Sequence, residues 1–77
     1  MQLKILRVMA NLTQAEAAAE VGVTQAALSD WENGKYKPGP AAINKLAEVY
    51  RVTVAEIVKA VEDAISRPKK EAANGAD

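Results

Sequence analysis

Two helix-start signals joined by a glycine turn constrain the fold of this chain most strongly. Thr13 can cap a first helix, and Glu16, three residues later, can reach back to the Thr13 amide, which makes a capping box. Gly22 supplies the backbone freedom for a turn, and Thr24 can then cap a second helix. The pattern predicts two short helices joined by a tight turn, the second closed by an Asn-Gly pair.

The second of these helices has one apolar side and one small, polar side. Leu28 and Trp31 lie on the side that is expected to face inward. Its outward positions are Gln25, Ala26, Ser29, Asp30 and Asn33. A helix that is small, polar and exposed at its N-terminal end can enter the major groove of DNA. We find no nucleophile–base set, paired-carboxylate site or phosphate loop, so no catalytic residue is assigned and no enzyme is expected.

Similar signals place three further helices around this pair. Pro40 stands at a favoured position for a first helical turn. Thr53 and Glu56 repeat the capping-box pattern before the last helix. The predicted helices cover about 2–10, 14–21, 25–33, 40–50 and a stretch that begins near 54. Because no alternating strand pattern is present, the sequence predicts an all-α fold.

Length and helical spacing predict one modest core. The 77 residues have room for a single domain, expected over 1–66, and the polar stretch 67–77 is expected to be a disordered tail. The side chains expected inside are Leu3, Leu6, Val21, Val23, Leu28, Trp31, Ile43, Leu46, Tyr50, Val52 and Ile57.

Composition excludes several kinds of site. The chain has no cysteine and no histidine, so it has no disulfide, no thiolate metal site and no imidazole ligand or proton shuttle. We therefore expect no cofactor and no metal. No apolar run approaches membrane-spanning length and no signal peptide precedes the first helix, so we expect a cytoplasmic protein that does not bind a membrane.

Charge is balanced overall but unevenly distributed. The net charge is zero, whereas DNA-binding domains are usually basic. Residues 1–34 carry a net charge of −2 and residues 35–51 a net charge of +3. The positive block directly follows the candidate groove-binding helix, where phosphates would lie.

The run from Leu3 to Ile57 resembles the helix-turn-helix domain of the Cro and phage-repressor type, the XRE family. The matching pieces are Leu3-Lys4-x-Leu6-Arg7, Leu12-Thr13-Gln14, Ala18, Gly22-Val23-Thr24-Gln25, Leu28-Ser29-x-Trp31-Glu32-Asn33-Gly34, Lys37-Pro38, Lys45-Leu46-Ala47 and Val52-Thr53-x-x-Glu56-Ile57. The resemblance implies a compact five-helix, lambda-repressor-like domain that binds a double-stranded DNA operator as a homodimer. Ala17 and Arg51 depart from the pattern, which usually has a larger aliphatic residue and a glycine there.

Three candidate DNA-binding residues lie where the two paired helices begin, namely Gln14, Thr24 and Gln25. The resemblance implies that Gln14 bonds a phosphate and braces Gln25; the alternative is that Gln14 is an ordinary exposed residue at a helix start. Thr24 begins the DNA-contacting helix as its cap. Gln25 is the first candidate base reader, because a glutamine amide can both donate to and accept from an adenine edge.

Other outward positions keep two interpretations each. Ala26 and Ala27 either contact thymine methyl groups or let the helix approach closely. Ser29 either reaches a phosphate or base or is an ordinary exposed serine. Asp30, where the family often has a basic or amide side chain, either accepts from a cytosine amine or points away from the groove. The remaining candidates, which position the DNA backbone, are Asn33, Lys35 and Lys37.

Two further groups are expected to be structural. By the resemblance, Arg7 and Glu32 form an ion pair that locks the second helix of the pair against the first helix of the chain. Val58, Val61 and Ile65 continue an apolar stripe along the last helix. This stripe either forms a dimer interface or completes the core of the single chain.

Three functions fit these observations. The leading one is a sequence-specific transcriptional repressor of phage or mobile-element type. An antitoxin that binds a toxin partner and represses its own operon is the alternative within the same fold. The third is a protein-interaction module that has lost DNA binding; the zero net charge and Asp30 are the features that support it.

Overall fold

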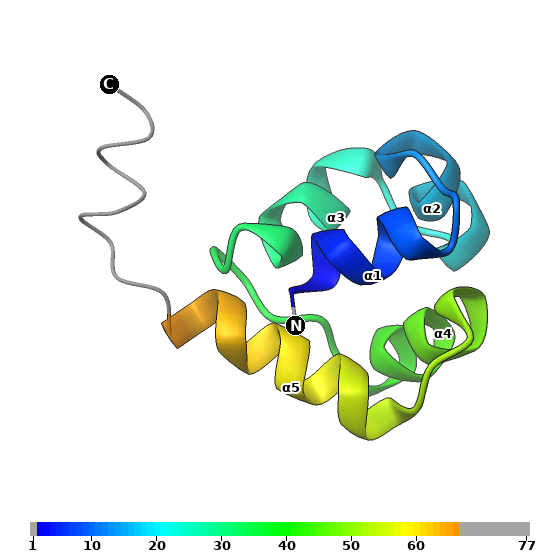
Figure 1. Cartoon of the computed structure of the whole chain (residues 1–77). Helices are drawn as coiled ribbons and strands as arrows, with labels where there is room; N and C mark the ends of the chain where they lie inside the picture. Colours follow the sequence, from blue (N-terminus) through cyan, green and yellow to red (C-terminus); the bar gives the residue numbers. More distant parts are fainter. Residues whose placement is uncertain (1, 67–77) are drawn as a thin grey trace.

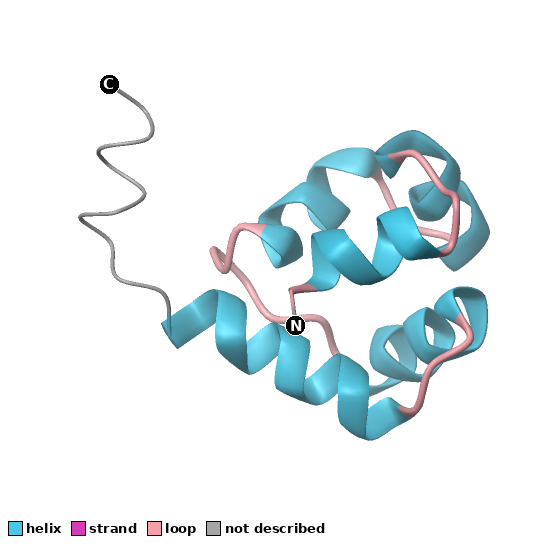
Figure 2. Ribbon diagram, viewed as in Figure 1, coloured by secondary structure: helices cyan, strands magenta, loops and turns pink. Residues whose placement is uncertain are grey.

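The structure, a computed structural model, describes residues 2–66 and contains five α-helices in that part of the chain (Figure 1). They are α1 (Leu3–Met9), α2 (Gln14–Val21), α3 (Gln25–Glu32), α4 (Pro40–Tyr50) and α5 (Val54–Ser66). Only helices, turns and loops occur among the described residues (Figure 2), so the all-α prediction is confirmed. The expected disordered tail, 67–77, lies outside the described residues.

The helices pack around one core. α2 contacts α3 and α4, while α5 contacts α1, α3 and α4. Figure 1 shows α1 in front, between the α2–α3 pair and α5. In the described part of the chain, no helix is long and apolar enough to cross a bilayer.

The core is close to the predicted one. Among the predicted residues, Leu3, Leu6, Val21, Leu28, Trp31, Leu46, Tyr50 and Ile57 are buried. Val23, Ile43 and Val52 are only partly buried and pack against the edge of the cluster, which corrects their assignment to the interior. Ala17 is fully buried at the position where the family usually has a larger side chain.

The helix ends follow the local signals. Glu16 Oε1 accepts from the Thr13 amide at 2.9 Å, and Thr13 Oγ1 accepts from the Glu16 amide at 3.1 Å. Thr53 and Glu56 make the same reciprocal pair before α5. α4 ends on Arg51, which adopts the left-handed conformation (φ 58°, ψ 46°) that a glycine usually supplies, so the turn keeps its form at a cost in backbone strain.

The last turns of α5 belong to the domain core. Ala60, Val61 and Ala64 are all buried, because they lie on the side of α5 that faces α1 and α3. Their small volume lets α5 approach the end of α3 closely. The extension of α5 therefore completes the single-chain fold and supports the segment that follows α3.

Candidate nucleic-acid interface

α3 presents its N-terminal end to solvent and its other side to the core. Thr24 Oγ1 accepts from the Ala27 amide at 3.0 Å and so begins the helix. Leu28 and Trp31 are buried beneath it. Gly22, in the left-handed region at φ 87°, makes the turn that brings the two helices together.

The candidate contact residues differ in their exposure to solvent. Gln25, Ala26, Asn33, Lys35 and Lys37 are exposed, whereas Ala27, Ser29 and Asp30 are partly buried. Gln14, the first residue of α2, is also partly buried, because its side chain is hydrogen-bonded to Gln25 and Glu32 of α3. Thr24 is exposed, but its side-chain oxygen is already engaged in the cap. Ala27 packs against the core, which leaves Ala26 as the more accessible of the two alanines.

Arg7 and Glu32 form a buried ion pair across the domain. Arg7 Nε donates to Glu32 Oε2 at 2.7 Å, and Arg7 Nη2 donates to Glu32 Oε1 at 3.4 Å. Arg7 Nη1 also donates to the Leu12 carbonyl at 3.0 Å. Arg7 is 8% exposed and Glu32 is 7% exposed. The fork of the guanidinium therefore ties α1, the α1–α2 connection and the end of α3 together.

A chain of hydrogen bonds continues from this ion pair to the solvent-exposed end of α3. Gln14 Nε2 donates to Glu32 Oε1 at 3.0 Å, and Gln25 Nε2 donates to Gln14 Oε1 at 3.2 Å. Gln25 thus keeps its carbonyl oxygen and one amide hydrogen for a further partner. The buried pair is thus connected through Gln14 to the exposed side-chain amide of Gln25. We had expected the Gln14–Gln25 contact but missed the link from Gln14 to Glu32.

The middle and end of α3 carry a second set of polar groups. Asn33 Nδ2 donates to Ser29 Oγ at 3.3 Å, so these two side chains are partly satisfied by each other. Lys35 Nζ lies 5.7 Å from the centroid of the Tyr36 ring. Tyr36 is 60% exposed, so most of its side chain lies on the outer surface.

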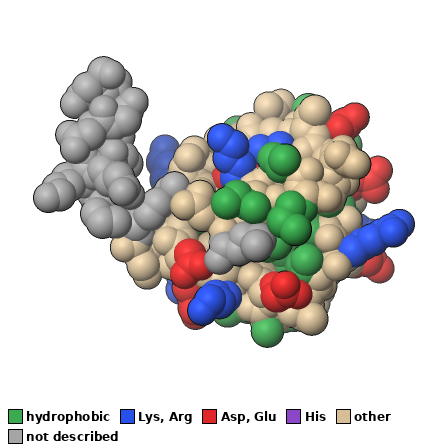
Figure 3. Space-filling view, viewed as in Figure 1, with side chains coloured by type: hydrophobic (Ala, Val, Ile, Leu, Met, Phe, Trp, Pro, Cys, Tyr) green, Lys and Arg blue, Asp and Glu red, His purple; other side chains and the backbone are tan. Residues whose placement is uncertain are grey.

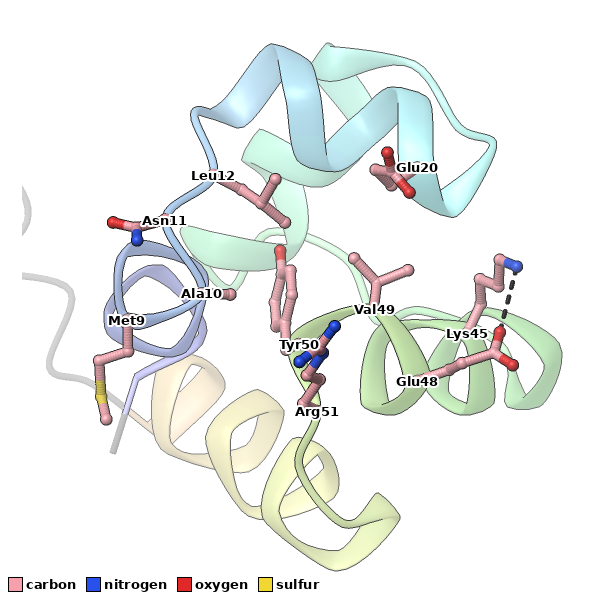
Figure 4. A pocket seen from close by; sticks show the side chains of 10 residues that line it. All are labelled: Met9, Ala10, Asn11, Leu12, Glu20, Lys45, Glu48, Val49, Tyr50 and Arg51. Carbon is pink, nitrogen blue, oxygen red and sulfur yellow. Dashed lines mark hydrogen bonds and ion pairs between the residues drawn. The ribbon is translucent and has the colours of Figure 1, made fainter.

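A cleft of about 700 Å³ lies away from this interface, between the α1–α2 connection and the C-terminal ends of α2 and α4 (Figure 4). An ion pair between Lys45 Nζ and Glu48 Oε1, 3.1 Å apart, lines one side of it. Tyr50 also lines the cleft, but its hydroxyl is buried and has no hydrogen-bond partner among the described residues. Burial, together with the nearby Glu32 carboxylate, raises the pKa of Tyr50 to about 12, while the Arg7 guanidinium acts in the opposite direction.

The apolar stripe on α5 differs from the predicted one. Val61 is 4% exposed and belongs to the core, which corrects its assignment to a dimer surface. Val58 is partly buried and Ile65 is 41% exposed. Val54, which the sequence reasoning missed, is 44% exposed, and its spacing of four from Val58 was the available signal.

Comparison with known proteins agrees with this geometry. The sequence model of a family described as helix-turn-helix matches residues 3–57. The HTH-type transcriptional activator BcrR of Enterococcus faecalis is 33% identical over 61 residues, which is 79% of this chain and 30% of that protein. The chain therefore spans less than a third of the length of this relative. No solved structure matches the chain.

Proposed function

This chain belongs to the XRE-type helix-turn-helix family, and from that premise we propose that it is a sequence-specific transcriptional regulator that binds operator DNA through α3. The observation that carries the proposal is the link from the buried Arg7–Glu32 pair through Gln14 to Gln25. An exposed surface glutamine has no need of such support for stability. A glutamine that must meet an adenine edge in one orientation does.

The positive charges near α3 also favour an orientation in which this helix faces the DNA. Lys35 and Lys37 lie in the exposed loop that follows α3, where they can approach phosphates on either side of the groove. We infer that these groups fix the domain on the backbone while α3 reads the bases.

Selection of bound sequences from random duplex DNA tests this proposal. We expect a defined motif, and Gln25→Ala should lose about 1–3 kcal/mol of discrimination at one base position in each half-site. Lys35→Ala and Lys37→Ala serve as the contrast, since they should weaken binding to all sequences and reduce the salt slope by about 1 each. A folded protein that enriches no sequence would contradict DNA recognition, and unchanged preference in Gln25→Ala would contradict its role as reader.

We propose that the working species is a two-fold homodimer on a palindromic operator. One recognition helix reads only a few base pairs, whereas two half-sites about 34 Å apart provide the required specificity. The candidate surface, which we call the α5 stripe, consists of Val54, Val58 and Ile65. It borders a shallow groove lined by Lys37, Pro38, Ile43, Val58, Val61 and Glu62.

The groove beside the α5 stripe is suited to self-association. Pro38, Ile43 and Val58 give it an apolar lining, so a two-fold axis can bring the stripe of each copy against the groove of the other. Lys37 also belongs to the loop after α3, so two copies joined here would present both loops to one DNA duplex. Ile65→Glu should therefore weaken association and operator binding together while helical content is kept.

Sedimentation of the wild type and Ile65→Glu, with and without DNA, measures this effect. Lys59→Ala, an exposed change on the other side of α5, is the matched control and should associate normally. Wild-type protein that stays monomeric on its selected site would contradict the dimer.

We further propose that binding represses transcription by occupying the promoter. In a purified transcription assay with the selected site placed across a promoter, added protein should reduce transcript yield. Increased yield would instead indicate an activator, the activity that the name of the E. faecalis relative states for that protein.

A second candidate function is protein binding, as in an antitoxin or an interaction module. Ile5, Val8 and Met9 are 45%, 55% and 68% exposed and share one side of α1. Figure 3 shows hydrophobic side chains gathered near the middle of this face of the molecule. If the selection enriches no sequence, this surface favours the second candidate.

A further inference from the structure

Asp30 is an acidic residue on the groove-facing side of a proposed DNA-binding helix. Its side chain is partly exposed, and no cation pairs with its carboxylate within residues 2–66. Lys35 is held close by its backbone, since the Lys35 amide donates to the Asp30 carbonyl at 2.9 Å. The Lys35 ammonium nevertheless lies over the Tyr36 ring, 5.7 Å from its centroid. The carboxylate therefore keeps its full accepting capacity.

The neighbouring outward side chains are used differently. Ser29 and Asn33 are bonded to each other, and Ala26 offers only a methyl group. Gln25 is held by Gln14. Within α3, Gln25 and Asp30 are therefore the outward side chains that keep a carbonyl or carboxylate oxygen for a base edge, and Asn33, just after the helix, also keeps its amide oxygen.

The helix spaces these two groups for neighbouring base pairs. Five residues of α-helix separate them along the axis by about 7.5 Å, close to two base-pair steps of about 3.4 Å. Asp30 lies about 140° around the axis from Gln25, with Ala26 between them on the same outward side. One pass of α3 through the major groove brings both side chains to the base edges.

The chemistry of a carboxylate narrows the choice of base. It only accepts hydrogen bonds, so guanine N7 and O6 and thymine O4, which are acceptors, repel it. Adenine presents its N6 amine beside the N7 acceptor, whereas the cytosine N4 amine has no acceptor next to it on the same base. We propose that Asp30 is a specificity-determining residue that selects a C·G pair about two steps from the A·T pair read by Gln25.

This inference rests on the proposed function. It implies that Asp30 lowers the affinity for DNA in general and raises the selectivity between sequences. A carboxylate near phosphates opposes binding at every sequence, and only a donor at the right base offsets the repulsion. Replacing Asp30 by asparagine should therefore raise affinity for unrelated DNA and flatten the preference at the C·G position. The preference at the A·T position should be retained.

Selection from random duplex DNA with the wild type, Asp30→Asn and Asp30→Ala tests the assignment. The wild type should enrich a half-site with both pairs, and changing the C·G pair should weaken its binding by about 10-fold or more, while either variant should lose most of that difference. Glu20→Gln, the same change of charge on an exposed residue of α2, is the control and should keep the C·G preference. Circular dichroism checks that each variant is folded.

The outcomes separate this inference from the proposed function. A wild-type motif whose A·T pair depends on Gln25, but whose other positions are unchanged in both Asp30 variants, overturns the role of Asp30 and leaves the function standing. Loss of preference in Glu20→Gln as well would show a general charge effect and also overturn it. Enrichment of no motif by the wild type refutes the proposed function and this inference with it.

Discussion

A side chain on Gly34 would collide with the backbone of Ala64: a Cβ atom there would lie 2.5 Å from the Ala64 carbonyl oxygen and 2.8 Å from its carbonyl carbon. Gly34 also adopts φ 77°, in the left-handed region. The segment that leaves α3 is thus pressed against the last turns of α5 at a distance that only glycine allows. This contact fixes the start of the lysine-bearing loop relative to the core.

Gly34→Ala should destabilise the domain more than Gly22→Ala. Both positions have positive φ, which costs about 1–2 kcal/mol for a residue with a Cβ atom. A Cβ on Gly22 meets nothing within 4 Å, so that variant measures the conformational cost alone. Urea unfolding of the two variants should show a clearly larger loss for Gly34→Ala. Equal losses would mean that α5 yields to the added methyl group.

Removing either partner of the Arg7–Glu32 pair should cost about 3–5 kcal/mol of unfolding free energy, because the other charge is left buried. The double variant should lose much less than the sum of the two single losses. Denaturant melts of Arg7→Ala, Glu32→Ala and the double variant form the cycle. Small, additive losses would contradict a buried, coupled pair.

Arg51→Gly should stabilise the domain by about 0.5–1 kcal/mol. The change relieves the left-handed strain, of about 1–2 kcal/mol, and part of that gain is offset by the greater freedom of glycine in the unfolded chain. Arg51→Ala removes the charge but keeps the strain, so thermal melts should show no gain for that control. A gain of equal size in both variants would assign the effect to charge.

Tyr50 should make stability depend on alkaline pH. Its pKa rises from 10.0 to about 12 on folding, so the folded protein holds the hydroxyl proton more tightly than the unfolded chain does. Its contribution is complete below pH 10 and is lost as the pH rises towards 12.

Unfolding free energies of the wild type and Tyr50→Phe, measured from about pH 8 to about pH 11, test that contribution. The difference between the two proteins should shift in favour of phenylalanine as pH rises. At pH 8 the variant should be no less stable than the wild type, because the buried hydroxyl has no partner among the described residues. A parallel pH response of both proteins would contradict the raised pKa.

Local sequence signals specified the five helices and two of their starts. Thr13 with Glu16, and Thr53 with Glu56, satisfy backbone amides three residues away, so these starts were readable without the fold. The all-α class and most core positions followed from the same local signals and from helical spacing. Each depends on interactions within about one helical turn.

Contacts between residues far apart in the chain follow from the packing of the helices. Periodicity placed Val58, Val61 and Ile65 on one flank of a helix, but only the packing of α5 against α1 and α3 shows that Val61 is buried and Ile65 is exposed. The spacing of side chains around a helix is a local property, whereas the boundary of its buried side is set by its neighbours.

The same reason applies to the candidate interface. Sequence identified Gln25 and its expected brace, Gln14, yet the bond from Gln14 to Glu32 spans 18 positions and the Arg7–Glu32 pair spans 25. Likewise, nothing near Gly34 in the chain indicates that Ala64 will lie against it. Such contacts form only when the helices pack, because backbone propensities and caps act over a few residues and carry no information about which side chains will converge.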